Sequence, residues 1–174
     1  MNVAMMIRRL KHRAVLLSAT LITLSIVGVF FAYGQIMMRP PEKASPVPFN
    51  TIYHGNGAQG YSKPADLVID NQSTCLSVWD SAFCSQSQCP PLPDVNFTSR
   101  TVIAAFYGLG GHSNNGIGID EVTRTTSTLD VHVVSVAGGN CGALIVTIYP
   151  AHIVDVPKTD LHVSFSTKTV PSNC

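Results

Sequence analysis

Charged side chains are scarce in this sequence of 174 residues: only 12% are Asp, Glu, Lys or Arg, against about 25% in a typical soluble domain. The basic residues are also unevenly placed, because four of the eleven stand near the start, at Arg8, Arg9, Lys11 and Arg13. The remainder is therefore slightly acidic and lacks the basic surface that neutralises phosphates. Nucleic-acid binding is excluded as a function class.

The sequence also lacks the short motifs of common catalytic and metal sites. It contains no G-x-S-x-G turn, no H-E-x-x-H helix and no C-x-x-C pair. His132 and His162 fall on the polar face of alternating runs, where they could share a metal only on neighbouring strands in matched register. We therefore predict a protein that is not an enzyme and that has neither metal nor cofactor.

One long stretch carries no charge at all. Residues 14–38 are uncharged and long enough to cross the roughly 30 Å hydrocarbon core as a helix. The basic residues before them predict that residues 1–13 stay in the cytoplasm and that the rest lies outside. We expect a single-pass signal-anchor in the cell membrane. The small residues of Ala32-Tyr33-Gly34 leave cleavage by a signal peptidase as the alternative.

A proline-rich segment follows the apolar stretch. Residues 39–48 (RPPEKASPVP) have no hydrophobic periodicity, which indicates an extended stalk. The extracytoplasmic domain then covers residues 49–174. Two triplets in it match the N-glycosylation acceptor, which makes Asn71 and Asn96 candidate modification sites.

The five cysteines fit an oxidising compartment. Cys84 and Cys89 are the first choice for a disulfide, because only SQSQ separates them and such a loop closes without distorting a helix or strand. Cys75 is either the competing partner for one of them or a small buried hydrophobe. Cys141 and Cys174 are then bonded or free, and the odd total leaves one thiol unpaired within the chain.

One helix is expected early in the domain, over residues 70–83 (DNQSTCLSVWDSAF), with Asp70 or Asn71 as its cap. Its apolar side chains recur at helical spacing, which places Trp79 in the core rather than in a ligand site. The side chains expected on the buried face are Cys75, Leu76, Trp79, Ala82 and Phe83.

From Thr101 onward the hydrophobic period changes to that of strands. The expected strands are residues 101–107, 116–122, 128–136, 143–150, 152–157 and 160–166. The first is apolar on both faces, as a central strand is. In the third, Leu129, Val131 and Val133 form the buried face. The predicted fold class is α+β, with a mostly antiparallel sheet of five to six strands and one amphipathic helix, preceded by a transmembrane helix.

The stretch YGLGGHSNNGIGI, residues 107–119, has two glycine clusters around a polar tip. A dinucleotide fingerprint starting at Gly108 fails, because Ser113 stands where glycine is required and a strand pattern follows instead of a helix. We predict a turn between antiparallel strands, with a recognition loop as the sharper hypothesis. The candidate partner-binding residues are Leu109, Gly110, Gly111, His112, Ser113, Asn114, Asn115 and Gly116.

The order of these segments resembles the carboxy-terminal domain family of the protease complex accessory subunit PrcB, over nearly all of the domain. The runs that carry the resemblance are DLVIDNQSTCLSVWD, DVNFTSRTVIAAFYG, GIGIDEV, TLDVHVVSV and YPAHIVDVPK. The positions that match the family pattern are Trp79, Phe97, Gly108, Tyr149, Pro150 and His152. The loop differs, since residues 112–117 replace the threonine and tyrosine of the family pattern.

This resemblance implies a non-catalytic subunit that binds and stabilises a secreted or surface protease. A direct protease inhibitor, whose loops would enter an active-site cleft, is the alternative, and a domain that binds a solute or sugar is a third possibility. His152, between apolar residues after Pro150, is expected to be a hydrogen-bonded structural residue rather than a base.

Overall fold

A computed structural model describes residues 43–84, 89–138 and 142–172. The predicted anchor at residues 14–38 lies outside these ranges, as do Cys141 and Cys174. Within the described ranges, no helix has both the length and the apolar character needed to cross a membrane.

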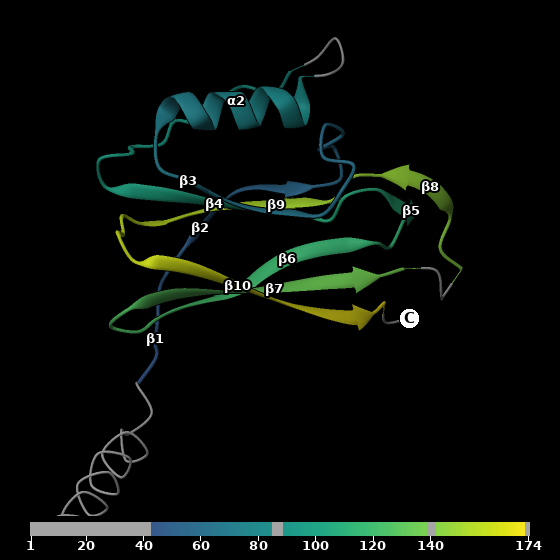
Figure 1. Ribbon diagram of the computed structural model, residues 1–174. Coiled ribbons are helices and arrows are strands. Elements are labelled where there is room, and N and C mark those ends of the chain that lie inside the picture. The colour runs from purple at the N-terminus through teal and green to yellow at the C-terminus, as the bar shows by residue number, and fades with distance from the viewer. Residues whose placement is uncertain (1–42, 85–88, 139–141, 173–174) are drawn as a thin grey trace, which may run out of the picture. The chain divides into compact units, whose positions relative to one another are not determined.

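The domain has three layers: helix α2 (Gln72–Phe83), one sheet beneath it, and a second sheet on the far side of the first (Figure 1). Sheet A has the strand order β1-β6-β7-β10, sheet B has the order β2-β9-β4-β3, and β5 pairs with β8 in a separate ribbon. The strands are β1 (Ser45–Pro46), β2 (Asn50–Gly55), β3 (Ala65–Ile69), β4 (Arg100–Phe106), β5 (Gly110–His112), β6 (Gly116–Arg124), β7 (Thr128–Ala137), β8 (Ile145–Ile148), β9 (Ala151–Pro157) and β10 (His162–Pro171).

Strand β4 is buried on both faces and separates two apolar cores. Val102, Ala104 and Phe106 face α2, whereas Ile103 and Ala105 face sheet A. Such continuous burial requires an almost unbroken apolar sequence, because the side chains from Thr101 to Phe106 do not reach water. The prediction of a central strand at residues 101–107 is therefore confirmed.

Helix α2 begins where the sequence predicts, because the side chain of Asn71 accepts a 2.8 Å hydrogen bond from the backbone N–H of Thr74. Its buried stripe runs through Cys75, Trp79, Ala82 and Phe83. Leu76 was expected on that stripe, but it is 46% exposed. It lies one residue after Cys75, about 100° around the helix axis and outside the stripe that faces sheet B.

All six predicted strand runs correspond to strands, and the pairing is mostly antiparallel. The strands divide between two packed sheets instead of forming one sheet of five to six, and β10 pairs in parallel with β7. The sequence did not reveal β1, β2, β3 and β5. β1 and β5, with two and three residues, are too short to establish a period of two. Neither β2 (NTIYHG) nor β3 (ADLVI) alternates apolar and polar residues along its length.

The predicted stalk is partly folded into the domain. Ser45 and Pro46 form β1 and pair with Arg124 and Thr123 of β6. The next residue, Val47, donates its N–H to the carbonyl of Val122 at 2.8 Å and packs against the core between the sheets. The folded unit therefore begins before Phe49.

Candidate functional site

The glycine-rich segment crosses from one sheet to the other. The strand before it, β4, belongs to sheet B, whereas the strand after it, β6, belongs to sheet A. The prediction of a hairpin is wrong, because both edges of β4 are already paired, with β3 and with β9. The chain must leave sheet B at this point, and on its way β5 pairs with β8.

Some of the predicted recognition residues hold this crossing together through hydrogen bonds. Asn115 is buried, its Oδ1 accepts a 2.9 Å hydrogen bond from the N–H of His112, and its Nδ2 donates to the Tyr107 hydroxyl at 2.8 Å. Gly110 is also buried, whereas His112, Asn114 and Gly116 are half-buried. The exposed members of the set are Leu109, Gly111 and Ser113.

The β5–β8 ribbon and the residues leading into it carry most of the exposed large apolar side chains in the described part of the chain. Ile145 is 87% exposed and Leu144 is 69% exposed. Two hydrogen bonds between Ser113 and Leu144 fix this segment. Ser113 donates its N–H to the Leu144 carbonyl at 2.9 Å, and Leu144 donates its N–H to the Ser113 hydroxyl at 3.1 Å. We call the exposed side chains of Leu109, Leu144, Ile145 and Val146 the ribbon surface.

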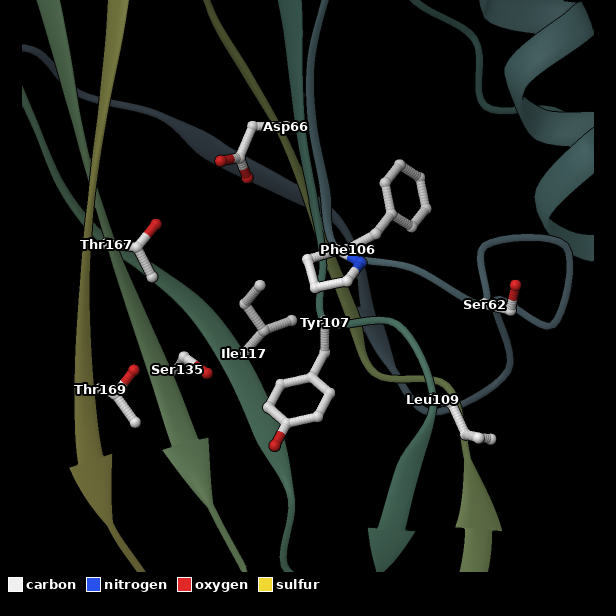
Figure 2. Close-up of a pocket in the computed structure, with 10 residues that line it drawn as sticks. Ser62, Asp66, Phe106, Tyr107, Leu109, Ile117, Ser135, Thr167 and Thr169 are labelled. Atoms are coloured by element: carbon white, nitrogen blue, oxygen red, sulfur yellow. The ribbon is translucent and has the colours of Figure 1, made fainter.

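A groove of about 460 Å³ opens beside the ribbon, between β3 of sheet B and β10 of sheet A (Figure 2). We call it the edge groove, since β3 and β10 are the outermost strands of the two sheets. Its volume falls in the range of roughly 300–1,000 Å³ that ligand sites span. The residues that line it are Ser62, Pro64, Asp66, Phe106, Tyr107, Leu109, Ile117, Ser135, Thr167 and Thr169.

The edge groove has one polar side, opposite apolar residues such as Pro64 and Phe106, because the inward face of β10 changes character along its length. Val163 and Phe165 pack against the core between the sheets, whereas Thr167 and Thr169, the next residues on that face, line the groove. In β7, Ser135 similarly follows buried Val133 at the strand's end. The sandwich therefore ends in hydroxyl groups that can bind polar ligands.

Asp66 is the acidic group of this groove. It pairs across the strand with Ala105, whose side chain faces sheet A, so the carboxyl also points toward the gap between the sheets. The residue is exposed overall, but partial desolvation against the groove raises the pKa of Asp66 above its ordinary value. Among the described residues, the ion pairs join other groups, Arg100 with Asp155 and Lys158 with Asp70. The Asp66 carboxylate is thus available to a cation from outside.

Away from the edge groove, two stacked histidines of sheet B contact sheet A. His152 is 6% exposed, its Nδ1 accepts a hydrogen bond from the N–H of Ile119, and its Nε2 lies 3.0 Å from the Thr51 hydroxyl. The ring of His54 stacks on it with centroids 4.4 Å apart. Desolvation, with a smaller contribution from His54, lowers the pKa of His152 to about 4. The expectation that His152 is a structural residue agrees with these contacts.

His132 and His162 do not face each other. In the parallel pair β7–β10, His162 lies opposite Thr128 and His132 lies opposite Ser166. The Ser166 hydroxyl and His132 Nδ1 are 3.1 Å apart, beside a shallow hollow that Asp120 also lines. A serine nucleophile needs its base oriented by a third group, and the hydrogen bonds of the described residues do not join Asp120 to this ring. We interpret the Ser166–His132 pair as a surface hydrogen bond.

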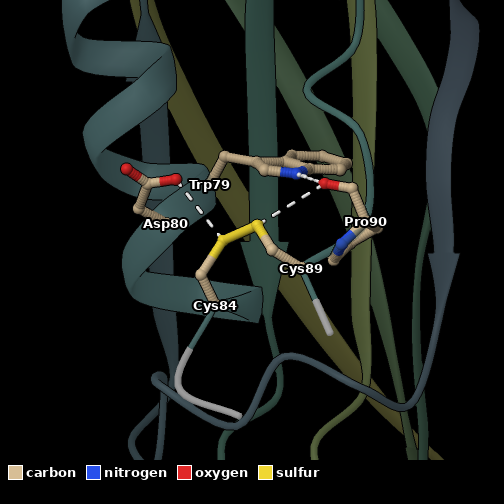
Figure 3. Close-up of a disulfide and its surroundings, with 5 residues drawn as sticks. All are labelled: Trp79, Asp80, Cys84, Cys89 and Pro90. Atoms are coloured by element: carbon tan, nitrogen blue, oxygen red, sulfur yellow. Dashed lines mark hydrogen bonds between the residues drawn. A yellow bond between two sulfur atoms is a disulfide. The ribbon is translucent and has the colours of Figure 1, made fainter. Parts of the chain in front are cut away.

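Cys84 and Cys89 form a disulfide just after α2, with Cα atoms 4.5 Å apart (Figure 3). Beside it, Trp79 donates its indole N–H to the Pro90 carbonyl at 3.0 Å, which fixes the chain after the disulfide against the helix. Asp80 lies close to both sulfurs, but sulfurs bonded to each other are not thiolate ligands for a metal. Cys75 is a free, buried thiol in the stripe beneath α2, where burial raises its pKa.

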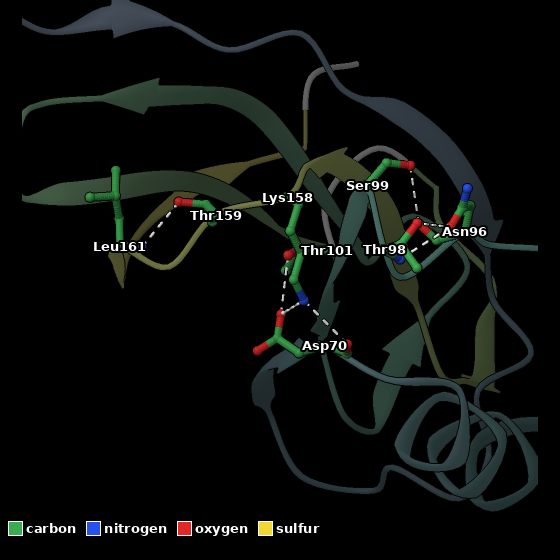
Figure 4. Close-up of polar contacts among 8 residues, drawn as sticks. All are labelled: Asp70, Asn96, Thr98, Ser99, Thr101, Lys158, Thr159 and Leu161. Atoms are coloured by element: carbon green, nitrogen blue, oxygen red, sulfur yellow. Dashed lines mark hydrogen bonds and ion pairs between the residues drawn. The ribbon is translucent and has the colours of Figure 1, made fainter.

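The two candidate glycosylation residues are exposed. Asn71 is also the helix cap. Asn96 lies in a turn in which its Oδ1 accepts hydrogen bonds from the Thr98 N–H and hydroxyl (Figure 4). Near this turn, Lys158 donates to both the carboxylate and the backbone carbonyl of Asp70, each at 3.2 Å. These contacts fix the start of α2 to the loop after β9.

Among the residues that line the edge groove, Leu109 was predicted from the sequence as a site residue, whereas the polar residues of the groove were not. A signal for Thr167 and Thr169 was present, because they continue the alternation of Leu161, Val163 and Phe165 with hydroxyl side chains. Asp66 had no such signal, since its role depends on where β3 lies in the sheet.

Comparison with known proteins identifies no relative: the chain matches no family model, and it matches neither a curated protein nor a solved structure.

Proposed function

We propose that this chain is a non-catalytic binding protein of the cell surface, in which residues 14–38 anchor the domain and the ribbon surface contacts a protein partner. The observation that carries this proposal is the exposure of Leu109, Leu144, Ile145 and Val146 on the ribbon. Large apolar side chains gathered on one short exposed element are costly in water, and apolar surface of this kind is typical of protein–protein interfaces.

The support of the ribbon also favours binding. A two-stranded ribbon is marginal by itself, but this one is tied to the sandwich through the Asn115 hydrogen bonds with His112 and Tyr107. The apolar side chains are therefore presented on a constrained backbone, which reduces the entropy lost when a partner binds.

We further propose that the partner is a surface or secreted protease, for which this chain is an accessory, stabilising subunit. The support for this is the resemblance of the sequence runs described above to the PrcB carboxy-terminal domain. A direct inhibitor would use the same surface, so activity of the captured protease separates the two roles.

The experiment is co-purification of the full-length chain from detergent-solubilised membranes, followed by assay of peptidase activity with and without added chain. Capture of an active protease, made more stable by the chain, is the expected result. Loss of peptidase activity on adding the chain would favour the inhibitor. Capture of no protease would contradict the accessory role.

A further inference from the structure

The free edge of β3 differs from the other three outer strands of the two sheets. Natural sheets protect their edges with short strands, bulges, lysine or proline. β1 has two residues, β2 has a register shift between Thr51 and Tyr53, and β10 carries Lys168 and Pro171. β3 pairs regularly with β4 over all five residues and carries no bulge, lysine or proline.

The side chains of β3 divide between a covered face and an open one. Ala65, Leu67 and Ile69 pack beneath α2. Asp66 and Val68 pair with Ala105 and Ile103, so they point toward sheet A. Val68 is nevertheless 37% exposed, because sheet A does not cover this edge. An uncovered strand edge thus carries one carboxylate and one apolar side chain, two residues apart.

We infer that this edge accepts an extended segment of the protein partner as an added strand, with a Lys or Arg side chain opposite Asp66 and an apolar side chain opposite Val68. Strand addition supplies main-chain hydrogen bonds to the unpaired edge, and pockets for alternate side chains give specificity. The inference rests on the proposed function, since the segment belongs to that partner.

Charge and shape support this occupant. Directly opposed cross-strand residues have Cβ atoms about 4.5–5.5 Å apart, so a basic side chain there meets the Asp66 carboxylate. Figure 2 shows the Asp66 carboxylate pointing toward the side of the groove that Thr167 and Thr169 of β10 line, and these residues offer further hydrogen-bond acceptors. Leu109 lines the groove and belongs to the ribbon surface, so one partner can contact both.

Asp66 also selects against the wrong strand. A second copy that paired parallel and in register through its own β3 would place two Asp66 carboxylates directly opposite each other, and such like-charge pairs are destabilising. In the full antiparallel register Asp66 would lie opposite Val68, so neither mode of self-pairing offers Asp66 the cation that a basic segment supplies.

The test uses the full-length chain in detergent micelles as the target for a phage-displayed library of random nine-residue peptides. The targets are the wild type, Asp66→Asn and, as a matched control, Asp160→Asn, which removes an equal charge at an exposed loop position. On the wild type and on Asp160→Asn, we expect several-fold enrichment of peptides that carry Lys or Arg two positions away from an apolar residue. Asp66→Asn should lose this preference, and an enriched peptide should bind it at least about tenfold more weakly.

Amide hydrogen exchange with an enriched peptide gives the second readout, in which residues 65–69 should become more protected. The inference would be overturned if Asp66→Asn still enriched peptides with Lys or Arg. It would also be overturned if a peptide bound without slowing amide exchange in β3. Dimerisation of Asp66→Asn with no basic preference on the wild type would also overturn it, because Asp66 would then act only against self-pairing. Capture of the protease that is unaffected by Asp66→Asn would contradict this inference and leave the proposed function standing.

Discussion

The backbone N–H of Ile119 in sheet A donates a 2.7 Å hydrogen bond to Nδ1 of His152 in sheet B. This contact exists because β1 pairs with only Thr123 and Arg124 of β6, which leaves earlier residues of β6 without a strand on that side. The carbonyl of Ile117, two residues before Ile119 on the same edge, accepts from His54 Nε2 at 3.1 Å. Two histidines thus satisfy buried backbone groups that a longer β1 would have paired.

This arrangement predicts that the domain loses stability in mild acid. His152 must be unprotonated at Nδ1 to accept from Ile119, and its pKa is lowered from 6.5 to about 4 in the folded protein. The unfolded chain therefore binds the proton first, and the contribution of His152 is full above pH 6.5 and declines as the pH falls toward 4. We expect a loss on the order of 2 kcal/mol between pH 7 and pH 5.

Urea unfolding of the wild type and of His152→Gln at both pH values measures this loss. Glutamine is polar but does not titrate, so the variant should be less stable at pH 7 and nearly independent of pH over this interval. Equal pH dependence in the two proteins would contradict the assignment to His152.

Gly60 is required by a close approach of its loop to α2. A Cβ at this position would lie 1.6 Å from the Ser81 carbonyl oxygen, and the Gly60 N–H donates to the Ala82 carbonyl at 3.2 Å. We expect Gly60→Ala to destabilise the domain by at least about 1–3 kcal/mol. Gly111→Ala is the control, because nothing lies within 4 Å of its added Cβ. Equal melting temperatures of the two variants would disagree with this packing.

Removal of the Asn115 side chain should unfold the base of the ribbon. In Asn115→Ala, the His112 N–H and the Tyr107 hydroxyl lose their partner, which costs about 1–3 kcal/mol for a buried group. Faster amide hydrogen exchange at residues 110–112 and 145–148 measures this. Gly111→Ala is the comparison at an exposed residue of the same segment, where an added Cβ meets nothing within 4 Å. Unchanged exchange in Asn115→Ala would show that other contacts hold the ribbon.

The cysteines differ in accessibility. We expect non-reducing peptide mapping of the full-length chain to recover a Cys84–Cys89 linkage. Cys75 should react with an alkylating reagent only after denaturation, because its thiol is buried beneath α2. Alkylation of all three thiols in the native, unreduced protein would contradict both expectations.

The sequence predicted those parts of the fold that hydrophobic periodicity encodes. Six strand runs and the helix with its Asn71 cap are where the residue pattern places them. It could not divide the strands between two sheets, since β4 and β6 are neighbours in sequence and yet belong to different sheets. The hairpin prediction for residues 109–116 failed for the same reason: Asn115 is typical of a turn, but the crossing between sheets buries it. Asp66 was missed because a free edge is a property of the assembled sheet.

The central claim, that the ribbon surface binds a protein partner, is tested most directly by quantitative co-purification of the full-length chain with Leu144→Ser and Ile145→Ser combined. Leu76→Ser is the matched control, because Leu76 is an exposed leucine on α2, away from the ribbon. We expect the double variant to melt as the wild type does and to lose most of its captured partner, since exposed apolar anchors dominate binding. We expect Leu76→Ser to capture as much as the wild type. Full capture by the double variant would contradict the claim.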